Sequence, residues 1–292
     1  MASSIFDNTE RAFILKSDSE LERAYFLFKM ISKEPLVRIG TAMTKFALNA
    51  NLPVEGLIRS TVFDHFCGGV SEDDCIPVMD KLYEAGVCSV LDYSVEGKEN
   101  EAQFDACLTK VLELTDFADE KEAMPISVFK PTGFGRFAIW KKKTAGETLT
   151  SEEQKEWERI VARFDAICKK AKEADVAVLI DAEESWMQDA ADDLVAEMMA
   201  KYNTEKAIVF NTLQCYRWDR LDYLKKLHVD ASVKGFKIGV KIVRGAYMEK
   251  ENNRAKELGY ETPICANKAA TDTNFNDTLR YIFDHIDDIS VF

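Results

Sequence analysis

Short apolar runs alternate with amphipathic helical segments from about residue 87 to the end of the 292-residue chain. The runs lie at 87–93, 126–130, 176–180, 207–210, 237–243 and 289–292. Repeated strand–helix alternation indicates parallel strands joined by helical crossovers, which is typical of α/β folds. A doubly wound sheet and a (β/α)8 barrel both fit this pattern.

The residues that follow the predicted strands favour the barrel. No Gly-x-Gly-x-x-Gly follows the first strand, where a dinucleotide-binding doubly wound fold would place one. Instead, polar side chains of catalytic type follow several successive strands: Asp92, Lys130, Asp181, Glu183, Glu184, Gln214, Arg244 and Tyr247. Barrel enzymes assemble their active sites at the carboxyl ends of the strands. We therefore predict an α/β fold of the TIM-barrel type, with its site at that end.

The predicted barrel is incomplete in this sequence. Its strands begin about 40 residues apart, so eight strand–helix units would extend to about residue 400, and about five to six units fit here. Residues 1–75 contain helical patterns only. The sequence thus predicts an N-terminal helical segment (1–75) and a barrel (76–292) whose C-terminal units are missing. An open sheet edge of this kind would favour aggregation.

Composition and charge exclude several classes of function. The chain has 38 Lys and Arg against 51 Asp and Glu, a net charge of −13. Such an acidic chain is poorly suited to binding nucleic acid or anionic lipid, because both attract positive charge. No apolar run exceeds five residues, so no transmembrane segment is expected. The N-terminus lacks the features of a signal peptide, and seven cysteines without a Cys-x-x-Cys pair indicate a cytoplasmic protein without a structural zinc site.

Two predicted strand ends carry charged side chains that allow more than one interpretation. Lys130 begins a Lys-Pro-Thr-Gly-Phe-Gly turn and could bind a substrate carboxylate, form a Schiff base or face solvent. Asp181, Glu183 and Glu184 could ligate a hard metal ion, orient a cation or transfer protons. Glu183 and Glu184 could instead form the acidic first turn of a helix, where the helix dipole favours them.

The next two strand ends suggest a site for a flat polar ligand. Residues 211–216 end a strand with amides and hydroxyls, which suits either a hydrogen-bonding ring system or strand-end capping. Strand alternation places Lys241 on the face opposite to its apolar neighbours, so it should point into a polar lumen or pair with an acid, unless it lies on an exposed edge. Arg244 is followed by Gly245 and Ala246, which leave room for the close approach of a flat ligand or a phosphate.

A last polar cluster, residues 268–276, precedes the final predicted helix. Asp272 or Thr273 would serve as the N-cap of that helix. The alternative interpretation is a pocket for a phosphate or adenine group.

Five segments together resemble the proline dehydrogenase family. They are Phe-Lys-Pro-Thr-Gly-Phe-Gly at 129–135, Ile-Asp-Ala-Glu-Glu at 180–184, Asn-Thr-Leu-Gln-Cys-Tyr at 211–216, Lys-Ile-Val-Arg-Gly-Ala-Tyr-Met-Glu-Lys-Glu at 241–251 and Lys-Ala-Ala-Thr-Asp-Thr-Asn-Phe-Asn at 268–276. The resemblance extends from Asp-Tyr-Ser-Val-Glu-Gly at 92–97 to the end of the chain. It implies a distorted (β/α)8 barrel that binds FAD without a covalent bond. It also implies oxidation of L-proline to Δ1-pyrroline-5-carboxylate, with electrons passed to a membrane quinone.

The resemblance implies roles for individual residues as well. Lys130 would bind the proline carboxylate, and Tyr247 would line the proline pocket. Asp181 and Lys241 would be the catalytic pair, with Lys241 near flavin N5, where many bacterial members carry arginine. FAD would be contacted by Ala182, Gln214, Lys241, Arg244, Gly245, Ala246, Lys268 and Thr271.

Two family features are expected to lie beyond Phe292: a Thr-His or Ser-His pair that contacts FAD, and paired arginines that hold the substrate carboxylate. We therefore expect these 292 residues alone to be inactive. We also expect the protein to be cytoplasmic and peripheral to the inner membrane. Two other hypotheses compete with the flavoenzyme. One is a metal-dependent or Schiff-base lyase that uses Asp181 with Glu183, or Lys130. The other is a half-barrel without catalytic activity that pairs with a second polypeptide.

Overall fold

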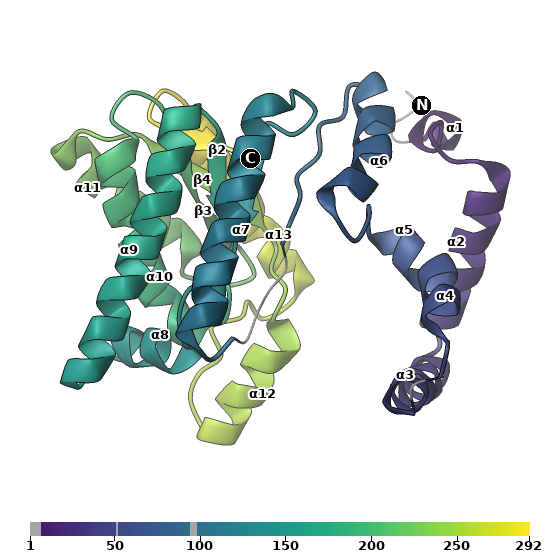
Figure 1. Cartoon of the computed structure of the whole chain (residues 1–292). Coiled ribbons are helices and arrows are strands. Elements are labelled where there is room, and N and C mark those ends of the chain that lie inside the picture. The colour runs from purple at the N-terminus through teal and green to yellow at the C-terminus, as the bar shows by residue number, and fades with distance from the viewer. Residues whose placement is uncertain (1–6, 51, 94–97) are drawn as a thin grey trace. The chain divides into compact units, whose positions relative to one another are not determined.

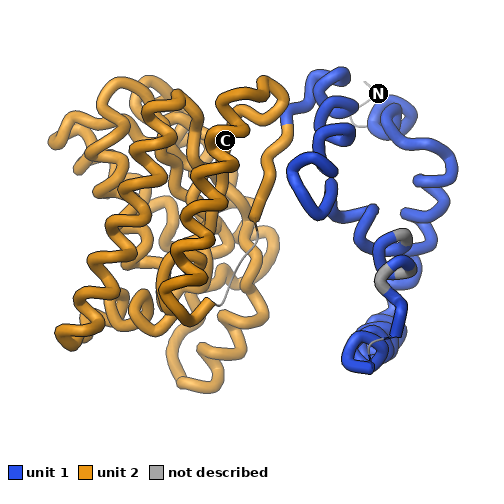
Figure 2. Tube along the Cα trace, in the orientation of Figure 1, with its two compact units in different colours: residues 1–88 blue, residues 89–292 orange. Residues whose placement is uncertain are grey.

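A computed structural model describes residues 7–50, 52–93 and 98–292. The chain divides into two compact units, one ending at Cys88 and the other beginning at Ser89 (Figure 2). The sequence predicted a boundary at 75/76. In the structure, the helix that follows Ser71 belongs to the first unit, together with the N-terminal helices. Each unit is described separately below.

The first unit is helical. Its elements are α1 (Thr9–Ala12), α2 (Asp18–Ile31), α3 (Glu34–Asn49), α4 (Glu55–Ile58), a π-helix (Arg59–Phe63), α5 (Asp64–Phe66) and α6 (Glu72–Glu84). Ser17 begins α2 in a capping box, in which its side chain accepts from the Glu20 amide and Glu20 accepts from the Ser17 amide. Hydrogen bonds from the Ser17 amide and hydroxyl to the Glu20 carboxylate lower the pKa of Glu20 to about 2. Among the described side chains of this unit, only Cys75 and Met79 are buried.

The second unit is a parallel sheet with helical crossovers. Its helices are α7 (Glu101–Glu120), a 3-10 helix (Pro131–Gly133), α8 (Phe137–Thr144), α9 (Ser151–Ala174), α10 (Ser185–Tyr202), α11 (Arg220–Lys234), α12 (Met248–Leu258) and α13 (Lys268–Asp284). Its strands are β1 (Ile126–Phe129), β2 (Ala177–Ile180), β3 (Val209–Gln214), β4 (Ile238–Val243) and β5 (Ile289–Val291). The strands lie in the order β1-β2-β3-β4-β5 and every neighbouring pair is parallel. Helices α7, α9, α10 and α11 lie around them (Figure 1).

Alternate residues of the strands face two different cores. One face packs against the helices in a large cluster, and its buried strand residues are Phe129, Val178, Ile180, Val209, Leu213, Ile238, Val240 and Ile289. The opposite face carries a small cluster of Val128, Leu179 and Phe210. We call these the outer and inner faces of the sheet. Both faces are covered with apolar residues near the amino ends of the strands, as parallel sheets require.

Two expectations about strands are wrong. Residues 87–93 do not form a strand: Asp92 makes one isolated parallel bridge, to Val128, and the motif residues 94–97 lie outside the described ranges. The third strand is Val209–Gln214 and not 207–210. Its polar residues Asn211, Thr212 and Gln214 are buried inside the strand. The Asn211 amide lies 2.9 Å from Asp192 and the Gln214 amide donates to the Glu183 carbonyl, so these two buried side chains are hydrogen-bonded.

The final polar cluster also differs from expectation. Helix α13 begins at Lys268, and its N-cap is Asn267, whose side chain accepts from the Ala270 amide at 2.9 Å. Asp272 and Thr273 therefore lie within the helix and do not cap it. No helix in the described ranges has the length and apolar composition needed to cross a membrane.

Candidate active site

Four polar side chains reach the inner face where the strands end. Lys130 and Asp181 each follow an outer-face residue, Phe129 and Ile180, so both belong to the inner face. The same alternation places Gln214 and Lys241 on the inner face of β3 and β4, because Leu213 and Val240 point outward. The sequence-based assignment of Lys241 to the face opposite its apolar neighbours is confirmed.

Asp181, which follows β2, lies between Lys130, which follows β1, and Lys241 of β4. Its carboxylate forms an ion pair with Lys241 and lies 3.7 Å from the Lys130 ammonium. Lys130 also donates a 2.9 Å hydrogen bond to Asp92. The three central side chains are only 14–23% exposed, so these ion pairs are weakly screened by solvent. The arrangement presents two ammonium groups and two carboxylates at the carboxyl end of the sheet.

Gln214 joins the loops on either side of β3. Its amide nitrogen donates to the Glu183 carbonyl at 2.8 Å, and its amide oxygen accepts from the Ala246 amide at 3.1 Å. Ala182, which follows Asp181, is buried beside this link. The side-chain amide is thus bonded at both ends, which holds the loops after β2 and β4 at a fixed separation.

The three carboxylates after β2 point to three different partners. Asp181 meets the lysines, while the buried Glu183 accepts from the amide and hydroxyl of Thr132, the latter at 2.7 Å. Glu184 forms an ion pair with Lys250 and occupies the N-cap position of α10 without a side-chain capping bond. Within the described ranges, no group of three or more His, Cys, Asp or Glu side chains is arranged to hold a metal ion. Asp181 and Glu183 bind different partners, so this geometry does not favour a metal-dependent lyase that uses the two together.

A Schiff-base role for Lys130 is not favoured either. A nucleophilic lysine must lose its proton, and that is helped by an apolar pocket or a neighbouring cation. The ammonium group of Lys130 instead contacts the carboxylates of Asp92 and Asp181, which stabilise its charged form.

The segment after β4 has a backbone geometry that requires glycine. Gly245 has φ 139°, and a Cβ on it would lie 2.2 Å from the ring of Tyr216. The Tyr216 ring therefore leaves no room for a side chain at position 245. Gly245 and Ala246 are nevertheless exposed to solvent. Tyr247 is half-buried at the N-cap of α12.

Arg244 and Lys268 meet at one carboxylate. Arg244 donates to Asp272 at 2.6 Å, and Lys268 contacts the other oxygen of Asp272 at 2.5 Å. Hydrogen bonds from Lys268 and Arg244 lower the pKa of Asp272. Thr271 is buried and donates to the carbonyl of the N-cap residue Asn267 at 3.3 Å, whereas Arg244 and Lys268 are exposed.

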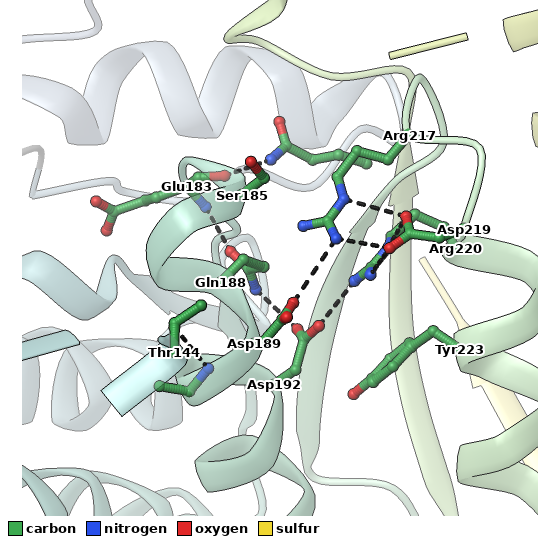
Figure 3. Close-up of polar contacts among 12 residues, drawn as sticks. Thr144, Glu183, Ser185, Gln188, Asp189, Asp192, Arg217, Asp219, Arg220 and Tyr223 are labelled. Carbon is green, nitrogen blue, oxygen red and sulfur yellow. Dashed lines mark hydrogen bonds and ion pairs between the residues drawn. The ribbon is translucent and has the colours of Figure 1, made fainter. Parts of the chain in front are cut away.

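A buried charge network near the site was missed at the sequence level. Arg220 is 5% exposed and donates to Asp192 at 2.7 Å and to Asp219 at 2.6 Å, while Arg217 binds the same Asp219 and lies 3.7 Å from Asp189 (Figure 3). Burial raises the pKa of Asp219, but hydrogen bonds from Arg220 and Arg217 outweigh it and lower the pKa to about 2. The signal was the charged Arg-Trp-Asp-Arg run directly after a strand. The network ties α10 to α11 behind the site.

A family model described as proline dehydrogenase matches residues 75–292. The chain is similar to the carbapenem antibiotics biosynthesis protein CarD of Pectobacterium carotovorum subsp. carotovorum, with 33% identity over 238 residues, 82% of this chain and 62% of CarD. It is also similar to proline dehydrogenase 1, mitochondrial, of Arabidopsis thaliana, with 27% identity over 321 residues, 94% of this chain and 64% of that protein. The chain thus spans less than two thirds of the length of these curated relatives.

Solved structures agree on the fold. Proline utilization A (PutA) of Bdellovibrio bacteriovorus, inactivated by N-propargylglycine, matches with a TM-score of 0.68 and 21% identity, over 81% of this chain and 26% of that one. At this identity the likeness shows the architecture alone: the five parallel strands correspond to a TIM-like barrel, as the sequence predicted. Together with the family match over residues 75–292, the conclusion is that this chain belongs to the proline dehydrogenase family.

Proposed function

We propose that the protein oxidises L-proline to Δ1-pyrroline-5-carboxylate with bound FAD. The observation that carries this proposal is the convergence of Lys130, Asp181 and Lys241 on the inner face, within one network of ion pairs. The family match supports the reaction, and the geometry supports a site that holds an anionic substrate beside a cation.

The residues around the end of β4 fit FAD. Lys241 and Arg244 supply positive charge, and the exposed Gly245 and Ala246, which follow Arg244, leave backbone accessible beside it. Cationic donors suit both an anionic pyrophosphate and a flavin ring that gains negative charge on reduction. Gln214, Ala182 and the exposed Lys268 are the further candidates for contact with FAD, whereas Thr271, bonded within its own helix, is the weakest of them. Bound FAD would supply the hydride acceptor for oxidation at the carbon next to the proline nitrogen.

The chain's own residues would bind and orient the substrate. Lys130 would exchange its contacts with Asp92 and Asp181 for a contact with the proline carboxylate, so that a charged pair is replaced by a charged pair. Asp181 would hold the Lys241 ammonium in place beside the reacting carbon. Tyr247 would cover the substrate from the start of α12. Fixing two reactants in this way supplies much of the rate enhancement for a transfer that needs little acid–base chemistry.

We further propose a membrane quinone as the electron acceptor, on the basis of the family match. In the described ranges, β1 and β5 each pair with one neighbouring strand, so the sheet is open. We propose that these 292 residues alone show no sustained turnover, because the sheet is open.

Colour and reduction test the proposal. The protein, and any longer product of its reading frame, should turn yellow after reconstitution with FAD and bleach anaerobically with L-proline but not with D-proline. Protein that stays colourless, or flavin that L-proline never reduces in any of these forms, would disprove it. Trapping of a substrate on Lys130 with borohydride, or loss of activity with a chelator, would favour the lyase instead.

A further inference from the structure

Helix α12 carries a buried carboxylate that no catalytic role explains. Of the residues of α12, only Glu251 and Ala255 are buried, and Glu251 is fully buried. Both of its carboxylate oxygens accept hydrogen bonds from Ser185, one from the amide and one from the hydroxyl, each 2.6 Å long. An isolated buried carboxylate is costly, and two charge-assisted hydrogen bonds offset that cost.

Ser185 is the first residue of α10. Glu251 accepts the hydrogen bond that an N-cap side chain would ordinarily accept from the start of this helix. The N-cap residue Glu184 makes no side-chain capping bond, and the first amide of α10, that of Ser185, donates to Glu251 instead. A carboxylate at a helix N-terminus is favoured both by these amides and by the helix dipole. Glu251 thus caps α10 from a helix that lies 66 residues further along the chain.

Two neighbouring contacts act on the same short stretch. Lys250 forms an ion pair with Glu184, and the Arg254 guanidinium lies 4.5 Å from the centre of the Trp186 ring. Three consecutive residues at the start of α10 are therefore bound by one turn of α12. We call these contacts the α12 clamp.

The α12 clamp joins the two loops that carry the proposed site. Ser185 follows the loop that begins with Asp181, and Glu251 comes one turn after the segment 244–247. We propose that Glu251 is a positioning residue, which fixes the segment 244–247 relative to Asp181 and thereby sets the affinity for flavin and substrate. This inference rests on the proposed function. Glu251 acts through Ser185 and the backbone of α12, and it contacts no reacting atom.

Four single variants and one double variant of the protein test the inference. Glu251→Ala removes both acceptors, Glu251→Gln retains one oxygen for the Ser185 amide, and Ser185→Ala removes the hydroxyl donor. Glu257→Gln, on an exposed position of the same helix, is the matched control. The readouts are hydrogen exchange of α10 and α12, the FAD dissociation constant from flavin fluorescence, and separate kcat and KM values for L-proline.

We expect Glu251→Ala to raise the FAD dissociation constant and the KM by about 10- to 100-fold, because small displacements of positioning groups have effects of this size. Exchange should rise at Ser185 and along α12, while β1 to β4 stay protected. Glu251→Gln should recover part of the loss, Glu257→Gln should match the parent, and adding Ser185→Ala to Glu251→Ala should add little, because the two residues share one interaction.

Two results would overturn the inference. One is that Glu251→Ala leaves α12 exchange and FAD affinity at parental values. The other is that protection falls equally throughout the sheet, which would indicate general stabilisation and not positioning. A parent protein that binds no FAD would contradict the proposed function separately, and the exchange data would still decide whether Glu251 fixes α12.

Discussion

The two units use apolar side chains in opposite ways. In the first unit, the described helices carry Phe26, Phe46 and other large apolar residues at the surface, and only Cys75 and Met79 are buried. In the second unit, one continuous core runs from α7 to β5 and includes fully buried Phe164 and Trp140. The contrast shows that an amphipathic pattern is enough to predict a helix, whereas the core and the site of this chain form where strands bring distant segments together.

The largest expected difference concerns core packing. Phe164 lies among Phe129, Phe134 and Trp140, with ring centroids 5.0–6.0 Å away. Phe164→Ala should lower the free energy of unfolding of the second unit by about 3–5 kcal/mol, because it leaves a cavity. Phe26→Ala, at a 64% exposed position of α2, should change the free energy of unfolding of the first unit by less than about 0.5 kcal/mol. Urea denaturation followed by far-UV circular dichroism measures both, and similar losses for the two variants would show that the contrast between the units is wrong.

The second prediction concerns where function resides. Lys241→Met removes the cation bound to Asp181 and should lower kcat/KM for L-proline by about 10²- to 10³-fold in the active form of the protein. Lys45→Met, at an exposed position of α3, should leave kcat/KM unchanged. Steady-state kinetics with an artificial acceptor compare them, and equal activity of Lys241→Met and the parent would remove Lys241 from the site.

The third prediction uses pH to probe the charge network of Figure 3. The pKa of Asp219 is lowered to about 2 in the folded protein, so its contribution to stability is present above the unfolded value of about 4 and is lost as the pH falls toward 2. That contribution is about 2 kcal/mol. Asp219→Asn should therefore flatten the dependence of the unfolding free energy on pH between about 4 and 2.

Asp222→Asn, an exposed position on the same helix, is the control and should keep the parental slope. Chemical denaturation at several pH values provides the data. An unchanged slope in Asp219→Asn would mean that the carboxylate does not titrate with an altered pKa.

The smallest expected effect compares two equivalent capping boxes. Ser17 caps α2 in the first unit and Thr150 caps α9 in the second, each paired with a glutamate three residues later. Replacing either residue with alanine should cost about 1 kcal/mol. In α9 the loss should appear in global stability, because that helix is part of the core, whereas in α2 it should appear as faster local hydrogen exchange. Loss of global stability in Ser17→Ala would indicate that α2 is packed more firmly than its exposure suggests.

Much of the second unit could be predicted from the sequence because strand alternation is local information. The order of strands and helices, and the inner-face positions of Lys130, Asp181 and Lys241, follow from which neighbours are apolar. Residues 87–93 were misassigned because a β-branched, apolar run resembles a strand even when its only bridge is Asp92 to Val128. The start of α13 was misplaced because Asn267, and not Asp272, provides the capping oxygen.

Contacts between distant segments could not be predicted. Ser185 and Glu251 are 66 residues apart, and nothing in either local pattern indicates that a buried glutamate caps another helix. The Arg217–Asp219–Arg220 run was visible, but its burial depends on Asp192, which α10 brings into contact. Side chains whose role depends on a tertiary partner require coordinates.

A crystal structure of the protein with FAD and L-proline tests the central claim most directly. We predict that the flavin ring lies on the inner face against Lys241, with the proline carboxylate bound by Lys130 and with Asp181 between the two lysines. A flavin bound elsewhere on the chain, or Lys130 and Lys241 separated from Asp181 and from both ligands, would contradict it.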